Sequence, residues 1–286
     1  MTDLPTGLST LADRYDVLLC DVWGVIHNGV ESYPEACKAL VEWRAHHGPV
    51  ILISNSPRPS AAVVEQLDAL GVPREAWSAF VTSGDATRTL LAERAPGPAW
   101  IVGPERDSTL YEGLGLETAG PEAAAFVAVT GMVDDENEAP SDYTDRLAIA
   151  AERGLTLICA NPDRVVQRGD RLIYCGGSLA DLYESLGGQV LMAGKPFAPI
   201  YDLALAQAAA LKGGPVDRTR VLCIGDGVIT DVKGAHDQGL ACLFIAKGIH
   251  GEAAIGADGK LDPAKVAGLL AAENLGATHA MGDLVW

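Results

Sequence analysis

Short runs of hydrophobic residues alternate with longer amphipathic segments along most of the chain. The runs are continuous rather than interrupted by polar residues, which is typical of parallel strands that are covered on both faces. They predict strands at residues 16–20, 50–54, 79–82, 99–102, 125–129, 155–159, 189–193, 220–224 and 241–245. Strands that alternate with helices predict an α/β fold with a doubly wound parallel sheet.

Several intervals between these strands show helical spacing. Hydrophobic residues in 60–71 fall on one face, and Gly71 is a suitable C-terminal stop. A similar pattern follows Pro34, and the alanine-rich segment 198–212 predicts a further helix. The strands are therefore joined by helices, as a doubly wound sheet requires.

Polar residues with chemical potential stand where predicted strands end. Asp21 follows the first strand, Ser54 ends the second, Lys195 follows the seventh, and Asp226 lies just beyond the eighth. Ligands of open α/β sheets collect at the carboxyl ends of the strands, so these residues form a candidate site. With Asp231 they supply a carboxylate nucleophile, a hydroxyl, a cation and a pair of metal-binding acids. Phosphoryl transfer through an aspartyl intermediate needs that set of groups.

The spacing of these residues predicts the domain organisation. Ser54 and Lys195 are 141 positions apart, which leaves room for a separate domain between them. We expect a core formed by residues 1–86 and 189–286, with an inserted α/β domain at 87–188.

Charge and composition exclude several classes of function. The net charge of −17 argues against nucleic acid or an anionic membrane surface as a partner. No hydrophobic run approaches the roughly 18 residues of a membrane span, and the N-terminal segment lacks the pattern of a secretory signal. The six cysteines show no CxxC spacing and predict reduced structural thiols. We therefore expect a soluble cytoplasmic protein.

The chain resembles the haloacid dehalogenase-like (HAD) hydrolase superfamily over nearly its whole length. Within it the chain looks closest to the class IIA branch, the group of nucleotide, sugar-phosphate and nitrophenyl phosphatases. The resemblance rests on six segments in their expected order, DVWGVIHNG, PEACKALVEWRAHHGPVILISNS, ANPD, CGGS, GKP and GDGVITD. It implies a Rossmann-like core with an inserted cap of the C2 type.

The resemblance assigns the nucleophile and a magnesium site. Asp21 is expected to attack phosphorus and form an aspartyl phosphate. Asp21, Asp226, Asp231 and the main-chain carbonyl of Trp23 are the expected ligands of Mg²⁺, which prefers few carboxylates and several waters.

The resemblance also implies contacts to the substrate, a small phosphorylated metabolite. Ser54 is expected to donate a hydrogen bond to a phosphoryl oxygen, and Lys195 to neutralise the phosphoryl group. Asn55 and Arg58 follow Ser54 and are candidates for substrate contact, as is Asn161 in the cap. Caps of this branch often pair, which makes a homodimer the expected assembly.

Trp23 is a departure from the pattern of this branch. An aspartate at this position protonates the leaving alkoxide and later deprotonates water, and an indole does neither. General acid–base help is typically worth about 10²–10⁴ in rate, or roughly 3–5 kcal/mol. His27, in the adjacent flap, is the nearest titratable candidate and another candidate for substrate contact.

Three alternatives to a phosphohydrolase remain open. The first is a non-catalytic protein that binds a phosphorylated metabolite, which the loss of the second aspartate favours. The second is carbon–halogen hydrolysis, which does not need a magnesium site. The presence of Asp226 and Asp231 therefore argues against it. The third is a bacterial receiver domain, which is far shorter than this chain and has its acid pair before the phosphorylated aspartate.

Overall fold

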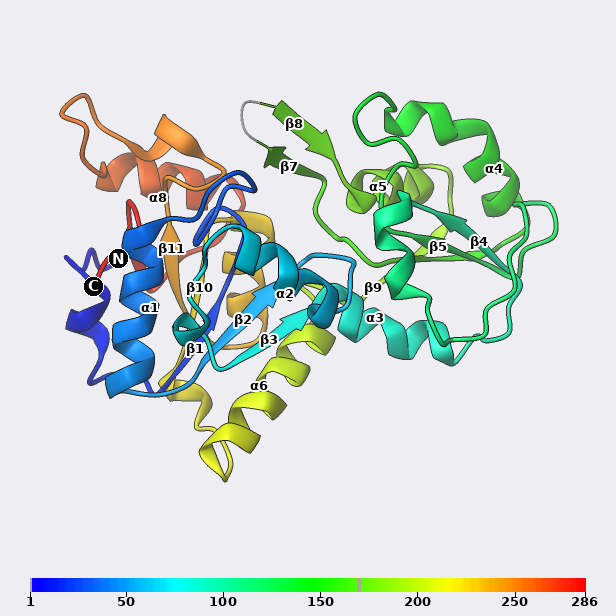
Figure 1. Ribbon diagram of the computed structural model, residues 1–286. Coiled ribbons are helices and arrows are strands. Elements are labelled where there is room, and N and C mark those ends of the chain that lie inside the picture. The colour runs from blue at the N-terminus through cyan, green and yellow to red at the C-terminus, as the bar shows by residue number, and fades with distance from the viewer. Residues whose placement is uncertain (1, 169–170) are drawn as a thin grey trace. The chain divides into compact units, whose positions relative to one another are not determined.

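The computed structural model describes residues 2–168 and 171–286, and its contacts divide the chain into two compact units (Figure 1). The first unit comprises Met1–Ser54, Glu65–Val81 and Tyr201–Trp286. The second unit comprises Asn55–Val64 and Thr82–Ile200. Each unit is built around its own parallel sheet. The boundaries of the predicted core and inserted domain stay predictions.

The first unit contains a six-stranded sheet with the strand order β12-β11-β10-β1-β2-β3. Its strands are β1 (Val17–Cys20), β2 (Val50–Ser54), β3 (Ala79–Thr82), β10 (Val221–Gly225), β11 (Ala241–Ile245) and β12 (His279–Met281). β1 pairs in parallel with both β10 and β2, and β10 pairs in parallel with β11. The predicted α/β fold with a doubly wound parallel sheet is confirmed.

Both faces of this sheet are buried, which explains the continuous hydrophobic runs. Leu18 and Cys20 of β1 belong to a core cluster that also contains Leu40 and Trp43 of α1 (Pro34–His46). The alternate residues of β1 are completely buried as well. Because successive side chains of a strand point to opposite faces, both faces must be covered.

Residues that favour the start of a helix occupy the N-termini of two helices. Proline occupies the first turn of α1 and of α8 (Pro263–Ala272), where its missing N–H costs no hydrogen bond. The Asp262 side chain caps α8 by accepting from the main-chain N–H of Ala264 at 2.8 Å. Besides α1, the α-helices are α2 (Ser60–Ala69), α3 (Ser83–Ala92), α4 (Thr144–Glu152), α5 (Gly176–Ser185), α6 (Ala198–Lys212), α7 (Lys233–Asp237) and α8 (Pro263–Ala272).

The second unit contains a four-stranded parallel sheet with the order β4-β5-β6-β9. Its strands are β4 (Ala99–Val102), β5 (Phe126–Val129), β6 (Thr156–Cys159) and β9 (Gln189–Met192). Tyr183 of α5 is completely buried in its core, and its hydroxyl donates to the Leu155 carbonyl at 2.6 Å. A separate core thus supports this unit.

An antiparallel hairpin in the second unit was not predicted. It consists of β7 (Val165–Arg168) and β8 (Arg171–Tyr174). Charged residues interrupt its hydrophobic pattern, so no continuous hydrophobic run marks these two strands. The three-residue strand β12 was missed as well, because it is too short to show a pattern.

All nine predicted strands are present in the described part of the chain, with bounds shifted by at most one residue.

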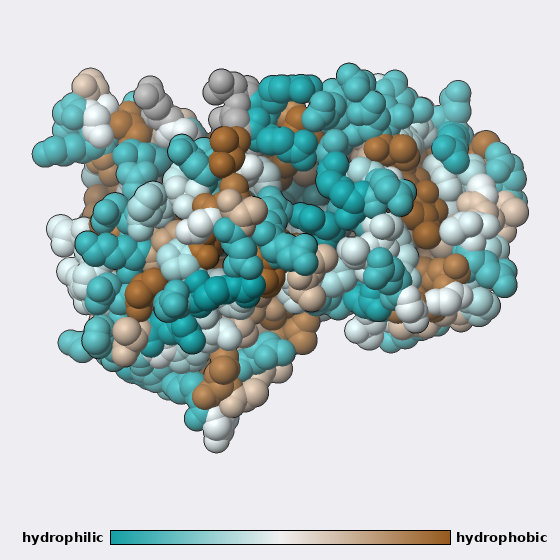
Figure 2. Space-filling model, in the orientation of Figure 1, coloured by the Kyte–Doolittle hydropathy of each residue, from teal (hydrophilic) through white to brown (hydrophobic). Residues whose placement is uncertain are grey.

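Polar side chains cover most of the face seen in Figure 2, where hydrophobic residues form small separate areas. Within residues 2–168 and 171–286, no helix is long and apolar enough to cross a membrane.

Candidate active site

The first unit places three predicted site residues at one edge of its sheet. Asp21 follows β1, Ser54 is the last residue of β2, and Asp226 follows β10. The main-chain N–H of Asp21 donates to the Ile224 carbonyl at 2.8 Å, which extends the pairing of β1 and β10 by one residue. Because these neighbouring strands are parallel, their carboxyl ends meet at the same edge.

Three carboxylates converge at this edge. Asp21, Asp226 and Asp231 each offer an oxygen, and these atoms lie within 4.8 Å of one another. Their residues are only 5%, 6% and 4% exposed. Three buried like charges at this spacing repel one another strongly unless a cation lies among them. An all-oxygen donor set of few carboxylates fits Mg²⁺, so these residues are suited to hold the expected metal ion.

Two glycines and one main-chain N–H fix the Asp226 side chain. Its Oδ2 atom accepts from the Ile249 N–H at 2.6 Å. A Cβ atom at Gly24 or at Gly248 would lie 2.0 Å from the same oxygen. Gly24 also has a φ of +83°, a conformation that favours glycine. The backbone therefore approaches Asp226 more closely than any other residue type would allow.

Asp231 is oriented by a local irregularity in the chain. It lies in a π-helix, Val228–Val232, an element that often occurs at functional sites. Its Oδ2 atom accepts from the Gly227 N–H at 3.0 Å and from the Thr230 hydroxyl at 3.3 Å. A Cβ atom at Gly225 would lie 2.2 Å from the Asp231 carboxyl carbon. A Cβ atom at Gly227 would lie 2.1 Å from the Thr230 hydroxyl oxygen and 3.0 Å from Asp231 Oδ2, so both glycines of the GDG segment leave room for this acid and its hydrogen-bond partner.

Trp23 packs within the loop that follows β1. Its indole meets the His27 ring edge to face, with the ring centroids 5.1 Å apart. A Cβ atom at Gly29 would lie 2.5 Å from the indole, so only glycine leaves room for the ring. The indole thus fills space in this loop beside the first-strand aspartate.

His27 is buried and neutral at physiological pH. The residue is 2% exposed, and loss of hydration lowers the pKa of its ring to about 4. Its Nδ1 atom accepts from the Gly29 N–H at 3.0 Å, which leaves the ring proton on Nε2. At pH 7 only about one molecule in a thousand would carry the imidazolium form at this pKa.

Lys195 is held by Asn55 within the second unit. The Asn55 amide accepts from the Lys195 N–H at 2.7 Å and donates to the Lys195 carbonyl at 3.1 Å. It also donates to Asp163 Oδ1 at 2.8 Å. A Cβ atom at Gly194 would lie 2.7 Å from the amide oxygen, so the glycine before the lysine permits this contact. Asn55 therefore joins the segment after β2, the ANPD segment and the GKP segment.

Asn161 takes part in a turn of the second unit. Its side-chain oxygen accepts from the Asp163 N–H at 3.2 Å, which is a typical turn of asparagine before proline. A Cβ atom at Gly177 would lie 2.2 Å from the Pro162 carbonyl oxygen. The ANPD and CGGS segments thus pack directly against each other.

Arg58 lies in the second unit with a partner that the sequence did not indicate. Its Nε atom is 3.9 Å from the carboxylate of Asp107, which is buried. Burial raises the pKa of Asp107, although neighbouring guanidinium groups oppose this change. Asp107 was missed because it lies in a short polar segment without any recognisable pattern.

The predicted site residues therefore fall into two groups, one in each unit. Asp21, Ser54, Trp23, Asp226 and Asp231 belong to the first unit, together with His27. Asn55, Arg58, Asn161 and Lys195 belong to the second unit. The assignment of catalytic and substrate-binding roles to them stays a prediction.

Comparisons with known proteins agree with this arrangement. The profile described as haloacid dehalogenase-like hydrolase matches residues 18–117, and one described as HAD-hydrolase-like matches residues 192–272. The crystal structure of a haloacid dehalogenase-like hydrolase from Brucella suis 1330 is 47% identical, with a TM-score of 0.88. The match covers 99% of this chain and 100% of that one.

Two curated relatives are similar over most of this chain. The 5'-nucleotidase YutF of Bacillus subtilis is 27% identical over 237 residues, which are 82% of this chain and 88% of that protein. The D-glycerol 3-phosphate phosphatase of Mycobacterium tuberculosis is 27% identical over 246 residues, which are 85% of this chain and 66% of that protein. The sequence segments, the two parallel sheets and these matches show that the chain belongs to the haloacid dehalogenase-like hydrolase family, in its class IIA branch.

Proposed function

We propose that the protein is a Mg²⁺-dependent phosphohydrolase that acts on small phosphorylated metabolites. The observation that carries this proposal is the buried group of Asp21, Asp226 and Asp231, whose oxygens lie within 4.8 Å of one another. The names of the two curated relatives, a nucleotidase and a glycerol phosphate phosphatase, support the same class of substrate. Retention of the whole acid group argues against carbon–halogen hydrolysis, which does not need a metal site.

In this proposal Asp21 is the nucleophile. Its carboxylate oxygen attacks phosphorus, the bond between phosphorus and the ester oxygen breaks, and the leaving oxygen takes a proton from solvent water. Water then attacks the aspartyl phosphate and loses a proton to solvent, which releases inorganic phosphate and restores the carboxylate. Bound Mg²⁺ would offset the charge of the phosphoryl group, with Asp226, Asp231 and the Trp23 carbonyl as its further ligands. Ser54 and Lys195 bind phosphoryl oxygens, and Asn55 positions the lysine.

Trp23 makes the proton transfers the slow part of this reaction. The indole cannot protonate a leaving alkoxide, and His27 is a poor substitute because its pKa is about 4 and its Nδ1 already accepts a hydrogen bond. Aryl and acyl phosphates depart with little protonation, whereas sugar and glycerol phosphates need an acid. We therefore propose that aryl or acyl phosphates are cleaved much faster than alkyl phosphates.

The test measures turnover of 4-nitrophenyl phosphate and trapping of phosphoenzyme, with Mg²⁺ and with a chelator. Asp21→Asn should abolish both signals, and Asp68→Asn, which alters an exposed ion pair with Arg74, should leave both unchanged. Equal turnover in Asp21→Asn and the unaltered protein would exclude the mechanism.

A second candidate is a phosphometabolite-binding protein without turnover. The observation that favours it is the Trp23 indole, which packs against His27 and Gly29 in the loop after β1. Calorimetry with Mg²⁺ and phosphate distinguishes the two candidates. Tight binding without any turnover of 4-nitrophenyl phosphate supports the binding protein, and measurable turnover removes it.

A further inference from the structure

Three exposed hydrophobic side chains stand on loops that surround the buried acids of the first unit. Val30 belongs to the loop after β1, Ile229 to the π-helix Val228–Val232, and Ile249 to the segment after β11. These residues are 65%, 36% and 42% exposed. We call their three side chains the apolar rim.

The loops that carry the apolar rim meet at the Asp226 carboxylate. The main-chain N–H of Ile249 donates to Asp226 Oδ2 at 2.6 Å. A Cβ atom at Gly248, or at Gly24 in the loop after β1, would lie 2.0 Å from the same oxygen. Ile229 is three residues after Asp226 on the third loop. Each of the three loops thus has its main chain beside one acid of the buried group.

Exposed hydrophobic side chains are few in the first unit and gather at this site. The described part of the unit exposes five large ones, of which three form the apolar rim. Leu4 follows Asp3, which pairs with the edge strand β12. Leu211 lies toward the amino end of the sheet, because the adjacent Lys212 pairs with Asp16, just before β1, at 3.0 Å. Single exposed hydrophobic residues are ordinary, whereas a group around a site indicates an apolar ligand.

Trp23 adds an aromatic surface to the loop after β1. The residue is partly exposed and lies two positions after Asp21, and its ring borders Gly29, which precedes Val30. Because an indole cannot protonate a leaving oxygen, the site favours leaving groups that depart without an acid. Aromatic hydroxyl groups meet this condition, since their pKa of about 10, as in tyrosine, is far below that of an aliphatic alcohol.

The position of the apolar rim relative to the acids identifies what it would contact. A phosphoryl group at the buried acids leaves its ester group to extend outward, between the loops that surround them. Aromatic rings bury a large apolar area, which exposed aliphatic side chains can cover. We propose that the apolar rim binds the leaving group of the substrate, and that this group is an aromatic ring. The proposal rests on the proposed function and narrows its substrate class to phosphate esters of aromatic hydroxyl groups.

Binding of three inert phosphonates tests the proposal. Methylphosphonate, phenylphosphonate and 2,3-dihydroxypropylphosphonate share the charged group, and the group attached to phosphorus is small, aromatic or hydroxylated. Calorimetry with Mg²⁺, at a pH where all three are dianions, should show phenylphosphonate bound about tenfold more tightly than either of the others. The heat capacity change of binding should be more negative for phenylphosphonate, because more apolar surface is buried.

The variants change the apolar rim and leave the acids intact. Val30→Thr and Ile249→Thr keep a branched side chain and replace an alkyl group by a hydroxyl, and the main-chain N–H that holds Asp226 is retained. In the double variant the preference for phenylphosphonate should fall below about threefold, while the affinity for methylphosphonate should stay within about twofold. The matched control is Leu211→Thr, the same kind of change toward the other end of the sheet, and it should keep the full preference.

Two results would overturn the proposal. One is that phenylphosphonate binds no more tightly than the other two compounds, and the other is a preference that persists in a double variant whose circular dichroism shows a folded chain. If the double variant does not fold, the single variants decide the question, since each should lower the preference by about twofold or more. Turnover of 4-nitrophenyl phosphate, and its loss in Asp21→Asn, test the proposed function separately. Equal phosphonate affinities with intact turnover would therefore contradict the role of the apolar rim alone.

Discussion

Replacing Trp23 by aspartate should restore proton transfer and raise turnover on alkyl phosphates. In the unaltered protein His27 contributes little acid at pH 7, because a pKa of about 4 leaves about one ring in a thousand protonated. A positioned carboxyl group is typically worth about 10²–10⁴ in rate, or roughly 3–5 kcal/mol in the barrier. The expected gain on glycerol 3-phosphate is therefore about a hundredfold or more, with a much smaller gain on 4-nitrophenyl phosphate.

Replacement of the Trp23 indole should also lower the free energy of unfolding. Trp23 is partly exposed and packs on His27, so its removal should destabilise the protein by about 1–3 kcal/mol rather than unfold it. Trp23→Asn is the matched control, because it opens the same space without adding a titratable group. The ratio of kcat/KM for the aryl and alkyl substrates is measured in both variants between pH 5 and 8.

A clear result would refute this reasoning. If Trp23→Asn gains as much on alkyl phosphates as Trp23→Asp does, then the indole acts by obstruction and not by the absence of an acid. If neither variant gains, the proton transfers are not the slow step, and another reaction or a binding function becomes the better account.

Three further predictions follow from packing and electrostatics. Asn55→Ala should destabilise the second unit by about 2–4 kcal/mol in denaturant unfolding and should raise KM, because buried groups of Lys195 lose their hydrogen-bond partner. Gly248→Ala should weaken Mg²⁺ binding at least tenfold by calorimetry, because its Cβ would lie 2.0 Å from the Asp226 oxygen. Hydrogen bonding to Arg220, and to a lesser extent to Lys212, lowers the pKa of Asp16 from 3.8 to about 2. The Asp16–Arg220 pair therefore contributes to the free energy of unfolding above the pKa that Asp16 has in the unfolded chain, and this contribution should be lost as pH falls from about 4 to 2. It amounts to about 1 kcal/mol or less because the pair is partly exposed.

Each of these predictions has a control and a contrary outcome. Asn55→Asp keeps an acceptor for the Lys195 N–H but places a second carboxylate beside Asp163, so it should destabilise the second unit at least as much as Asn55→Ala does, and a milder effect would contradict the assigned contacts. Gly239→Ala changes a glycine that has no neighbour within 4 Å of its Cβ position, and it should leave Mg²⁺ affinity unchanged. Unaltered metal affinity in Gly248→Ala would mean that Asp226 does not need its close packing. Asp16→Asn should flatten the stability between pH 4 and 2, and an unchanged slope would contradict the assignment to Asp16.

The sequence was sufficient to predict the sheets and the acids at their ends. Continuous hydrophobic runs located the strands, and parallel strands place the residues that follow them at one edge, as Asp21 and Asp226 show. Asp231 was predicted only by resemblance, because its orientation depends on a π-helix that has no simple sequence pattern. The close packing of glycines around these acids could not be predicted from the sequence either, because it depends on the three-dimensional structure.

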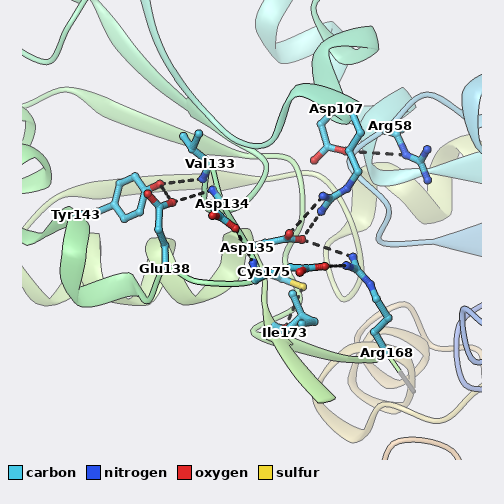
Figure 3. Close-up of polar contacts among 12 residues, drawn as sticks. Arg58, Asp107, Val133, Asp134, Asp135, Glu138, Tyr143, Arg168, Ile173 and Cys175 are labelled. Carbon is cyan, nitrogen blue, oxygen red and sulfur yellow. Dashed lines mark hydrogen bonds and ion pairs between the residues drawn. The ribbon is translucent and has the colours of Figure 1, made fainter. Parts of the chain in front are cut away.

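The residues of the second unit were harder to predict, since they act through contacts distant in sequence. Asn55 was expected to contact substrate. The hydrogen bonds of its side-chain amide to Asp163 and Lys195 could not be deduced from the spacing of these residues in the sequence. Arg58, Arg106 and Arg168 come from three separate segments, and Arg168 is the last residue of β7 in the hairpin that the charge pattern concealed (Figure 3). Loop conformation, which local sequence determines only weakly, decides which of these side chains meet.

The Asn55 amide has a consequence for how the protein is made. It joins positions separated by 108 and 140 residues along the chain, so its bonds form only after the ribosome has released the third partner. Contacts of such long range form late because a large loop must close first. The GKP segment with Lys195 should therefore be among the last parts to acquire its final shape during synthesis. A fragment of residues 87–188 expressed alone would contain Asp163 but neither Asn55 nor Lys195, and would lack this set of hydrogen bonds.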